Sequence, residues 1–318
     1  MSTPRPCRSL GNGSGTYGQD IDASSAARGH LVAAGDAVPR RRADDASLAR
    51  LTAHYRDSAV DGIVLAATTG EGLTLTEEEI ERLVATVAAT LEGDRPLYLG
   101  LCGSDTRRLT QRLAATATWP IAGYLIACPY YTRPSQEGLR RHFTALAEHT
   151  DKRIVLYNIP YRTGVNLANE TVFRLAELAN IVGVKDCCAD AAQSFDLLRG
   201  RPPGFAVLTG EDASFYGALA QGADGGILAS AHADPAAFAA LCDAVLSGDR
   251  SGALARWGEL VALARLLFAE PSPAPIKHWL WRMGLIDSPE LRLPMTAISP
   301  ELAGRLDRLF RARRTAAA

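Results

Sequence analysis

Short apolar runs alternate with longer helical patterns along most of this chain, and this alternation constrains its fold more than any other feature. From about residue 44 onward, seven uninterrupted apolar runs recur at intervals of about 20–35 residues. The runs are Gly62–Ala66, Leu97–Leu101, Gly123–Ala127, Ile154–Asn158, Ile181–Lys185, Phe205–Thr209 and Gly225–Ser230. Uninterrupted apolar runs are typical of strands buried on both faces, as in a parallel sheet. The sequence therefore predicts repeated strand–helix units, which either close as an eight-stranded barrel or lie open as a doubly wound sheet.

The segments between and after the runs have the spacing of amphipathic helices. Thr76 and Glu79 have the spacing of a capping box, and apolar residues at 80, 83, 84, 87 and 91 then form one stripe. Three more helices are expected after the last run, over Asp234–Leu246, Gly252–Phe268 and Ser299–Arg311. The first residue of the last range is a suitable N-cap, and a proline follows it. These segments predict a helical region beyond the strand–helix repeat.

An eighth strand has only a weak candidate, His30–Ala34, which a basic run follows at residues 40–42. Seven runs plus this candidate favour the α/β class and the TIM (β/α)8 barrel. Residues 1–29 are rich in Gly, Ser and Arg and show no apolar periodicity, so we expect a disordered extension. We expect the barrel catalytic domain over residues 30–233, with its first strand uncertain. The last barrel helix and a C-terminal helical region would then occupy residues 234–318.

The overall charge narrows the class of partner. The 34 basic residues nearly balance the 35 acidic ones, which leaves a net charge of −1. This balance gives no electrostatic footprint for nucleic acid or an anionic membrane, so small molecules are the expected ligands. No stretch resembles a membrane span or the apolar core of a secretory signal, so we expect a cytoplasmic protein.

The cysteines and histidines suggest neither a disulfide framework nor a metal site. The six cysteines contain no CxxC pair and no zinc-ligand spacing, and the six histidines contain no HExxH motif. We interpret the cysteines as reduced thiols, and the adjacent pair Cys187 and Cys188 as packing residues. No metal and no bound cofactor are expected.

Lysine is scarce, which draws attention to the three that are present. Only Lys152, Lys185 and Lys277 are lysines among the 34 basic residues. Lys152 lies in a polar turn and Lys277 in the C-terminal region, whereas Lys185 ends an apolar run. Desolvation at such a strand end lowers the pKa of a lysine and makes a neutral, nucleophilic amine available. Lys185 is therefore a candidate Schiff-base lysine, although most lysines are simply solvated.

Tyr157 precedes Lys185 by one strand–helix repeat, so the two side chains are expected on neighbouring strands at the same level of the barrel mouth. A phenol at this place could pass protons to and from an adduct on the lysine. A core tyrosine bonded to the backbone is the alternative interpretation.

Six motifs in the same order resemble those of the dihydrodipicolinate synthase family, within the N-acetylneuraminate lyase superfamily of Schiff-base aldolases. They are AATTGEG at 66–72, PYYTRPSQEG at 129–138, YNIPYRTGVNL at 157–167, IVGVKD at 181–186, LTGEDA at 208–213 and LRLPMT at 291–296. The resemblance extends from about residue 44 to the C-terminus. It implies a lyase that condenses pyruvate with L-aspartate 4-semialdehyde in the biosynthesis of diaminopimelate and lysine, without a cofactor or metal.

The resemblance also implies roles for individual residues. Lys185 would condense with pyruvate, while Tyr157, Thr68 and Tyr131 would form a proton relay, with Tyr131 reaching in from a neighbouring protomer of a homodimer or homotetramer. Thr68 and Thr69 would hold the pyruvate carboxylate. The remaining residues implied in substrate binding are Arg162, Gly210 and Ile227.

Arg162 is the position that best separates the possible acceptors. A guanidinium can grip a carboxylate through two parallel hydrogen bonds, which suits an amino-acid aldehyde better than a polyhydroxylated sugar chain. The sequence departs from the family pattern at Ala67, at Gly72 and at residues 186–188, and the family's first-strand motif has no clear counterpart before Asp44. The changes after Lys185 could tune the pocket or the acceptor.

Two alternatives remain open at this point. The same lysine chemistry would serve a pyruvate-dependent lyase, aldolase or dehydratase acting on a 2-keto-3-deoxy sugar acid or N-acetylneuraminate. A catalytically silent ligand-binding relative is the other alternative, and the presence of Lys185, Tyr157, Thr68 and Tyr131 argues against it.

Overall fold

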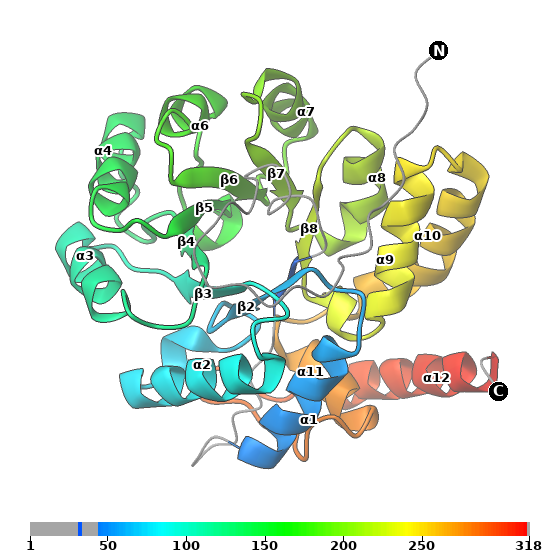
Figure 1. The fold of residues 1–318 in the computed structure, drawn as a ribbon. Helices are drawn as coiled ribbons and strands as arrows, with labels where there is room; N and C mark the ends of the chain where they lie inside the picture. Colours follow the sequence, from blue (N-terminus) through cyan, green and yellow to red (C-terminus); the bar gives the residue numbers. More distant parts are fainter. Residues whose placement is uncertain (1–30, 34–43, 317–318) are drawn as a thin grey trace.

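Eight parallel strands close into a barrel in the computed structural model, which describes residues 31–33 and 44–316 (Figure 1). The strands follow one another around the barrel in chain order, and β1 pairs with both β2 and β8. They are β1 Leu31–Ala33, β2 Gly62–Leu65, β3 Leu97–Leu101, β4 Gly123–Ala127, β5 Arg153–Asn158, β6 Ile181–Asp186, β7 Ala206–Thr209 and β8 Gly225–Leu228. The predicted TIM (β/α)8 class is confirmed, and the open doubly wound sheet is excluded.

Helices follow the strands and surround the barrel (Figure 1). The α-helices are α1 Asp45–Arg56, α2 Glu77–Leu91, α3 Thr106–Ala115, α4 Gln136–Ala147, α5 Pro160–Thr163, α6 Asn169–Leu175, α7 Ala191–Gly200, α8 Phe215–Ala220, α9 Pro235–Leu246, α10 Arg250–Leu266, α11 Ala274–Arg282 and α12 Pro300–Ala316. Three short 3-10 helices are η1 Gly72–Thr74, η2 Asp212–Ser214 and η3 Ser230–His232.

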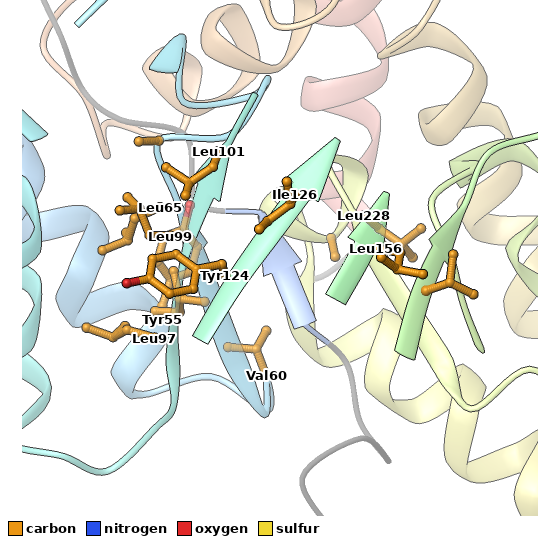
Figure 2. Packing of buried hydrophobic residues seen from close by; sticks show 14 of the residues in the cluster. Tyr55, Val60, Leu65, Leu97, Leu99, Leu101, Tyr124, Ile126, Leu156 and Leu228 are labelled. Carbon is orange, nitrogen blue, oxygen red and sulfur yellow. The ribbon is translucent and has the colours of Figure 1, made fainter. Parts of the chain in front are cut away.

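Both faces of the sheet are buried, which explains why the strands are uninterrupted apolar runs. Successive side chains of a strand point to opposite faces. On β5, Val155 and Tyr157 belong to one buried cluster, whereas Ile154 and Leu156 belong to a second, much larger one. The first cluster fills the barrel interior, and the second lies between the barrel and its helices. Figure 2 shows part of the larger cluster.

The predicted strand positions agree with the structure to within two residues. Three runs lose residues at an end: β2 stops at Leu65, β7 begins at Ala206 and β8 stops at Leu228. Ala66 leaves β2 because its φ is 52°, which an extended strand does not allow. The weak candidate His30–Ala34 supplies β1 over Leu31–Ala33, and the expected extension at 1–29 lies outside the described residues.

The predicted helix starts are confirmed by their caps. Thr76 accepts a hydrogen bond from the Glu79 amide, and the Glu79 carboxylate accepts one from the Thr76 amide, which completes the capping box of α2. Ser299 caps α12, since its hydroxyl accepts a bond from the Leu302 amide at 3.2 Å. The helix α11 has no predicted counterpart, because prolines interrupt the pattern at its start: Pro273 is the N-cap residue and Pro275 lies in the first turn.

The last barrel helix is α9, and three helices follow it. Helix α10 packs against α9, and α12 packs against both α10 and α11 (Figure 1). No helix within residues 44–316 is long and apolar enough to cross a membrane. The carboxyl ends of the strands form the face on which barrels of this class carry their functional residues.

Candidate active site

Lys185 lies near the carboxyl end of β6 and is 8% exposed. Its strand neighbour is Tyr157 of β5, since the two residues are register partners in the β5–β6 pair. The Lys185 Nζ lies 4.3 Å from the centroid of the Tyr157 ring. The prediction that these side chains occupy neighbouring strands at one level is confirmed.

Burial is the main influence on the pKa of both side chains. Desolvation lowers the pKa of Lys185 below its usual value of 10.5, and the positive charge of Arg162 contributes in the same direction. The pKa of Tyr157 is raised well above 10.0, again mainly by desolvation. The site therefore favours a neutral amine beside a protonated phenol, which suits a nucleophile paired with a proton donor.

Three further ionisable groups lie around the lysine, from Cys187, Glu211 and Asp212. The negative charges of Asp212 and Glu211 act in the opposite direction to desolvation and raise the pKa of Lys185. Burial raises the pKa of Glu211 and of Asp212, and it keeps the Cys187 thiol un-ionised by raising its pKa. Asp212 also accepts a 2.6 Å hydrogen bond from the Ser230 amide, which fixes it to the loop after β8.

Gly210 follows β7 and leaves the room that Lys185 and Cys187 fill. A Cβ added at Gly210 would lie 2.3 Å from the Lys185 Cε and 2.4 Å from the Cys187 Sγ. Because such distances are far below van der Waals contact, any larger residue at 210 would have to displace the side chains of Lys185 and Cys187.

Thr68 and Thr69 lie in the loop that joins β2 to η1. Thr69 is buried, at 5% exposure, whereas Thr68 is exposed. The loop turns tightly, because the Glu71 amide donates to the Thr68 carbonyl at 3.2 Å and the Gly72 amide donates to the Ala67 carbonyl at 3.1 Å.

Arg162 lies in the short helix α5, directly after β5. Its guanidinium carbon is 5.7 Å from the centroid of the Tyr161 ring, and the side chain of Tyr161 is exposed. The side chain of Tyr131 is 91% exposed, and its amide donates to the Thr163 carbonyl at 3.2 Å. Tyr131 thus projects into solvent from this single chain, beside the segment that carries Arg162.

Ile227 of β8 is buried inside the barrel. It belongs to the same interior cluster as Tyr157 and Cys187. The structure thus brings Lys185, Tyr157, Gly210 and Arg162 into one region, with Ile227 in the packing beneath it.

Glu211, Asp212 and Tyr161 lie at the site without a role predicted from the sequence, and Cys187 lies closer to Lys185 than its sequence position indicates. Cys187 is interpreted in the sequence as a packing residue within a stretch that could tune the pocket, and its place against Lys185 makes it part of the site. Glu211 and Asp212 stand in the motif LTGEDA directly after a strand, so position at a strand end was the signal that could have revealed them.

The other two lysines have structural partners. The Lys152 Nζ donates to the carbonyls of Trp119 and Ile121, at 3.1 and 2.8 Å. The Lys277 Nζ lies 2.6 Å from the Glu71 carboxylate. The cysteines of the described segments are free, as predicted, and Cys7 lies outside them. Within the same segments, no cluster of three or more His, Cys, Asp or Glu side chains could hold a metal ion.

Comparisons with known proteins agree with this geometry. The family model for the dihydrodipicolinate synthetase family matches residues 38–312. The chain is 43% identical over 269 residues to 4-hydroxy-tetrahydrodipicolinate synthase 2 of Clostridium acetobutylicum, covering 85% of this chain and 94% of that protein. It is 38% identical over 256 residues to the 4-hydroxy-tetrahydrodipicolinate synthase of Laribacter hongkongensis, covering 80% and 88%.

Solved structures give the same result. The dihydrodipicolinate synthase of Aquifex aeolicus superposes with a TM-score of 0.87 at 31% identity, covering 90% of this chain and 98% of that one. The 4-hydroxy-tetrahydrodipicolinate synthase of Methylacidiphilum fumariolicum SolV gives a TM-score of 0.86 at 35% identity, covering 89% and 95%. With the match of the family model over most of its length, the chain belongs to the dihydrodipicolinate synthetase family.

Proposed function

We propose that this protein condenses pyruvate with L-aspartate 4-semialdehyde through a Schiff base on Lys185 and so forms 4-hydroxy-tetrahydrodipicolinate. The observation that carries the proposal is the burial of Lys185 at the mouth of the barrel, against Tyr157, with a lowered pKa. The names of the relatives, which are synthases of this product, support the choice of substrates.

The first half of the reaction needs a neutral amine. The Lys185 Nζ attacks the keto carbon of pyruvate, and loss of water gives the imine. Loss of a proton from the pyruvate methyl group then gives the enamine. The protonated phenol of Tyr157 would supply the proton that the departing hydroxyl needs, and with Thr68 and the partner subunit's Tyr131 it would form the relay that returns protons to solvent.

The second half joins the two substrates. The enamine carbon attacks the aldehyde carbon of L-aspartate 4-semialdehyde, and the new alkoxide takes up a proton. The amine of the second substrate then attacks the imine carbon, which closes the ring and releases Lys185 as a free amine.

Binding roles follow from the chemistry of each residue. Thr68 and Thr69 would hold the pyruvate carboxylate with their amides or hydroxyls, and Arg162 would hold the carboxylate of the second substrate. Gly210 would leave room for the lysine and its adduct, and Ile227 would close the floor of the site.

The wider organisation extends the proposal. We assign catalysis to residues 30–233 and a supporting role to the helices of residues 234–318. The exposed side chain of Tyr131 favours a homodimer, or a pair of dimers, in which this tyrosine completes the site of its neighbour. Because the lysine itself carries the covalent intermediate, the reaction needs no metal or cofactor. We place the enzyme in the cytoplasm, where both substrates would be available.

Borohydride reduction in the presence of pyruvate tests the Schiff base. The hydride converts the imine to a stable secondary amine, which peptide mass mapping locates. We expect the adduct on the peptide that contains Lys185 and none in Lys185→Arg. An adduct only at Lys152 or Lys277, or no adduct in the unmodified protein, would show that the proposal is wrong.

Parallel assays test the acceptor. We expect turnover of pyruvate with L-aspartate 4-semialdehyde, and no turnover of 2-keto-3-deoxy sugar acids or N-acetylneuraminate. Arg162→Lys should raise the KM for the aldehyde, because an ammonium cannot reproduce the paired hydrogen bonds of a guanidinium. Turnover of the sugar acids alone would replace this function with that of a sugar-acid lyase.

A further inference from the structure

The loop that carries Thr68 and Thr69 has an unusual backbone conformation. Ala66 and Glu71, at its two ends, both have a φ of 52°, in the left-handed region that non-glycine residues seldom adopt. A Cβ at Gly72 would lie 1.8 Å from the Ala66 carbonyl oxygen, so the two ends of the loop touch. Such a backbone persists only where its surroundings hold it in place.

The Glu71 carboxylate, at the end of this loop, is buried in the protein. Its side chain is 2% exposed, and each of its two oxygens accepts a hydrogen bond. One bond comes from the Lys277 Nζ at 2.6 Å, and the other from the Arg292 amide at 2.9 Å. Lys277 belongs to α11 and is itself buried, with its side chain 3% exposed. Both donors come from the segment that follows the barrel.

Arg292 holds the same stretch at a second place. Its guanidinium donates to both oxygens of Glu79, at 2.7 and 2.6 Å, and to the Thr74 carbonyl at 2.9 Å. Glu79 in turn caps the start of α2. The C-terminal segment therefore bonds to residues 71–79 at both ends of that stretch. Glu71 is the bonded residue that lies beside the two threonines.

We propose that Lys277 is a positioning residue for pyruvate, which acts through Glu71 to hold the amides and hydroxyls of Thr68 and Thr69 in the geometry that binds the carboxylate. The inference rests on the proposed function, in which these threonines bind pyruvate. Removal of the ammonium leaves the buried carboxylate without its ion-pair partner, and such a group moves toward water or takes up a proton. Either response weakens the contact that holds Glu71, whose amide is bonded to the Thr68 carbonyl.

The test compares Lys277→Met with Lys152→Met. The control removes an ammonium that donates to the carbonyls of Trp119 and Ile121, in the segment between α3 and β4. Within the described residues, the Lys152 ammonium makes no hydrogen bond to the loop that carries Thr68 and Thr69. For each variant, the pyruvate concentration that gives half-maximal borohydride trapping at Lys185 is measured. The KM for L-aspartate 4-semialdehyde is then measured at saturating pyruvate.

We expect Lys277→Met to raise the half-saturating pyruvate concentration by about tenfold or more, as misplacement of binding groups does, with the KM for the aldehyde unchanged. Lys152→Met should leave both values unchanged. Equal pyruvate dependence in Lys277→Met and the unmodified protein would overturn the inference. A parallel rise in both KM values, or the same rise in the control, would also overturn it, because that result indicates general destabilisation.

A second variant covers the case in which Lys277→Met does not fold. Glu71→Gln keeps the size of the side chain but presents an NH2 group to one of its two donors, so one of the bonds must break. We expect a smaller rise in the half-saturating pyruvate concentration, again without a change in the KM for the aldehyde. An unchanged half-saturating pyruvate concentration would contradict the inference. If the unmodified protein itself shows no adduct at Lys185, the proposed function fails instead, so the two failures are distinguishable.

Discussion

The three lysines of the chain show how environment decides what one side chain does. Lys152 donates to backbone carbonyls near a turn, and Lys277 pairs with a carboxylate in the interior. Lys185 has neither arrangement: it lies near the end of a buried strand, and its amine lies over the ring of Tyr157. Because its stem is surrounded by apolar groups, its charged form loses hydration that nearby acids only partly replace, and its pKa falls.

This shift predicts the pH dependence of the first chemical step. Enamine formation can be followed without the second substrate, as deuterium uptake into the pyruvate methyl group. We expect its rate to rise with pH through the lowered pKa of Lys185 and to level off below 10.5. The phenol of Tyr157, whose pKa is raised, stays protonated over this range and causes no decline.

The same shift has a consequence for stability. Between the lowered pKa of Lys185 and 10.5, the unfolded chain binds a proton that the native chain has released, so the free energy of unfolding increases with pH.

Lys152→Met serves as the control for the deuterium-exchange experiment and should retain the dependence of the exchange rate on pH. A profile that rises only at or above 10.5 would mean that Lys185 is not desolvated in solution.

At the scale of elements, the segment between β5 and α6 contains only the short helix α5, and side-chain amides hold it in place. The Asn158 Oδ1 accepts from the Leu167 amide at 3.0 Å, and its Nδ2 donates to the Asn166 Oδ1 at 2.9 Å. Asn166 in turn donates to Gln193 of α7 at 2.7 Å. Arg162 lies inside this segment, so the orientation of its side chain depends on these amide hydrogen bonds.

Asn158→Leu should therefore act on the second substrate and spare the first. Loss of the amide leaves the buried Leu167 N–H without an acceptor, at a cost of about 1–3 kcal/mol, so the segment relaxes. We expect the KM for L-aspartate 4-semialdehyde to rise by about tenfold, with pyruvate exchange little changed. Steady-state kinetics of both substrates measure this split.

The matched control is Asn180→Leu. Asn180 precedes β6 and donates to the carbonyls of Ala147 and Thr150, at the end of the barrel opposite the site. This variant should lose a similar number of bonds without a selective effect on the aldehyde. Equal changes in the KM values of both substrates in Asn158→Leu would contradict a positioning role for these amide hydrogen bonds.

At the scale of the whole molecule, closure of the barrel depends on its shortest strand. The backbone of β1 pairs with Gly62–Val64 of β2 on one side and with Ile227 and Leu228 of β8 on the other. The match to the family model begins only at residue 38, so this strand lies outside it. Three residues thus join the first and last parts of a sheet that is otherwise built from clear sequence signals.

Val32→Pro tests this closure. Proline lacks the amide hydrogen that a strand paired on both sides uses, so the ladder should open at β1. We expect a clear fall in the melting temperature and loss of activity, since Ile227 would lose its strand partner. Val32→Ala keeps the amide hydrogen, so its melting temperature, measured by calorimetry, should fall much less. Equal melting temperatures for the proline variant and the unmodified protein would show that β1 is dispensable.

The amino-acid sequence by itself determined the strand–helix repeat, the barrel class, most strand positions within two residues, and the placement of Lys185 and Tyr157 on neighbouring strands. These features are local, or recur at one repeat, so periodicity and spacing reveal them. Only the tertiary structure decided that Leu31–Ala33 closes the barrel, that Gly210 packs against Lys185, and that Glu71 meets Lys277 across 206 positions. Such contacts depend on how the closed sheet and its helices bring distant segments together, and no local pattern contains that information.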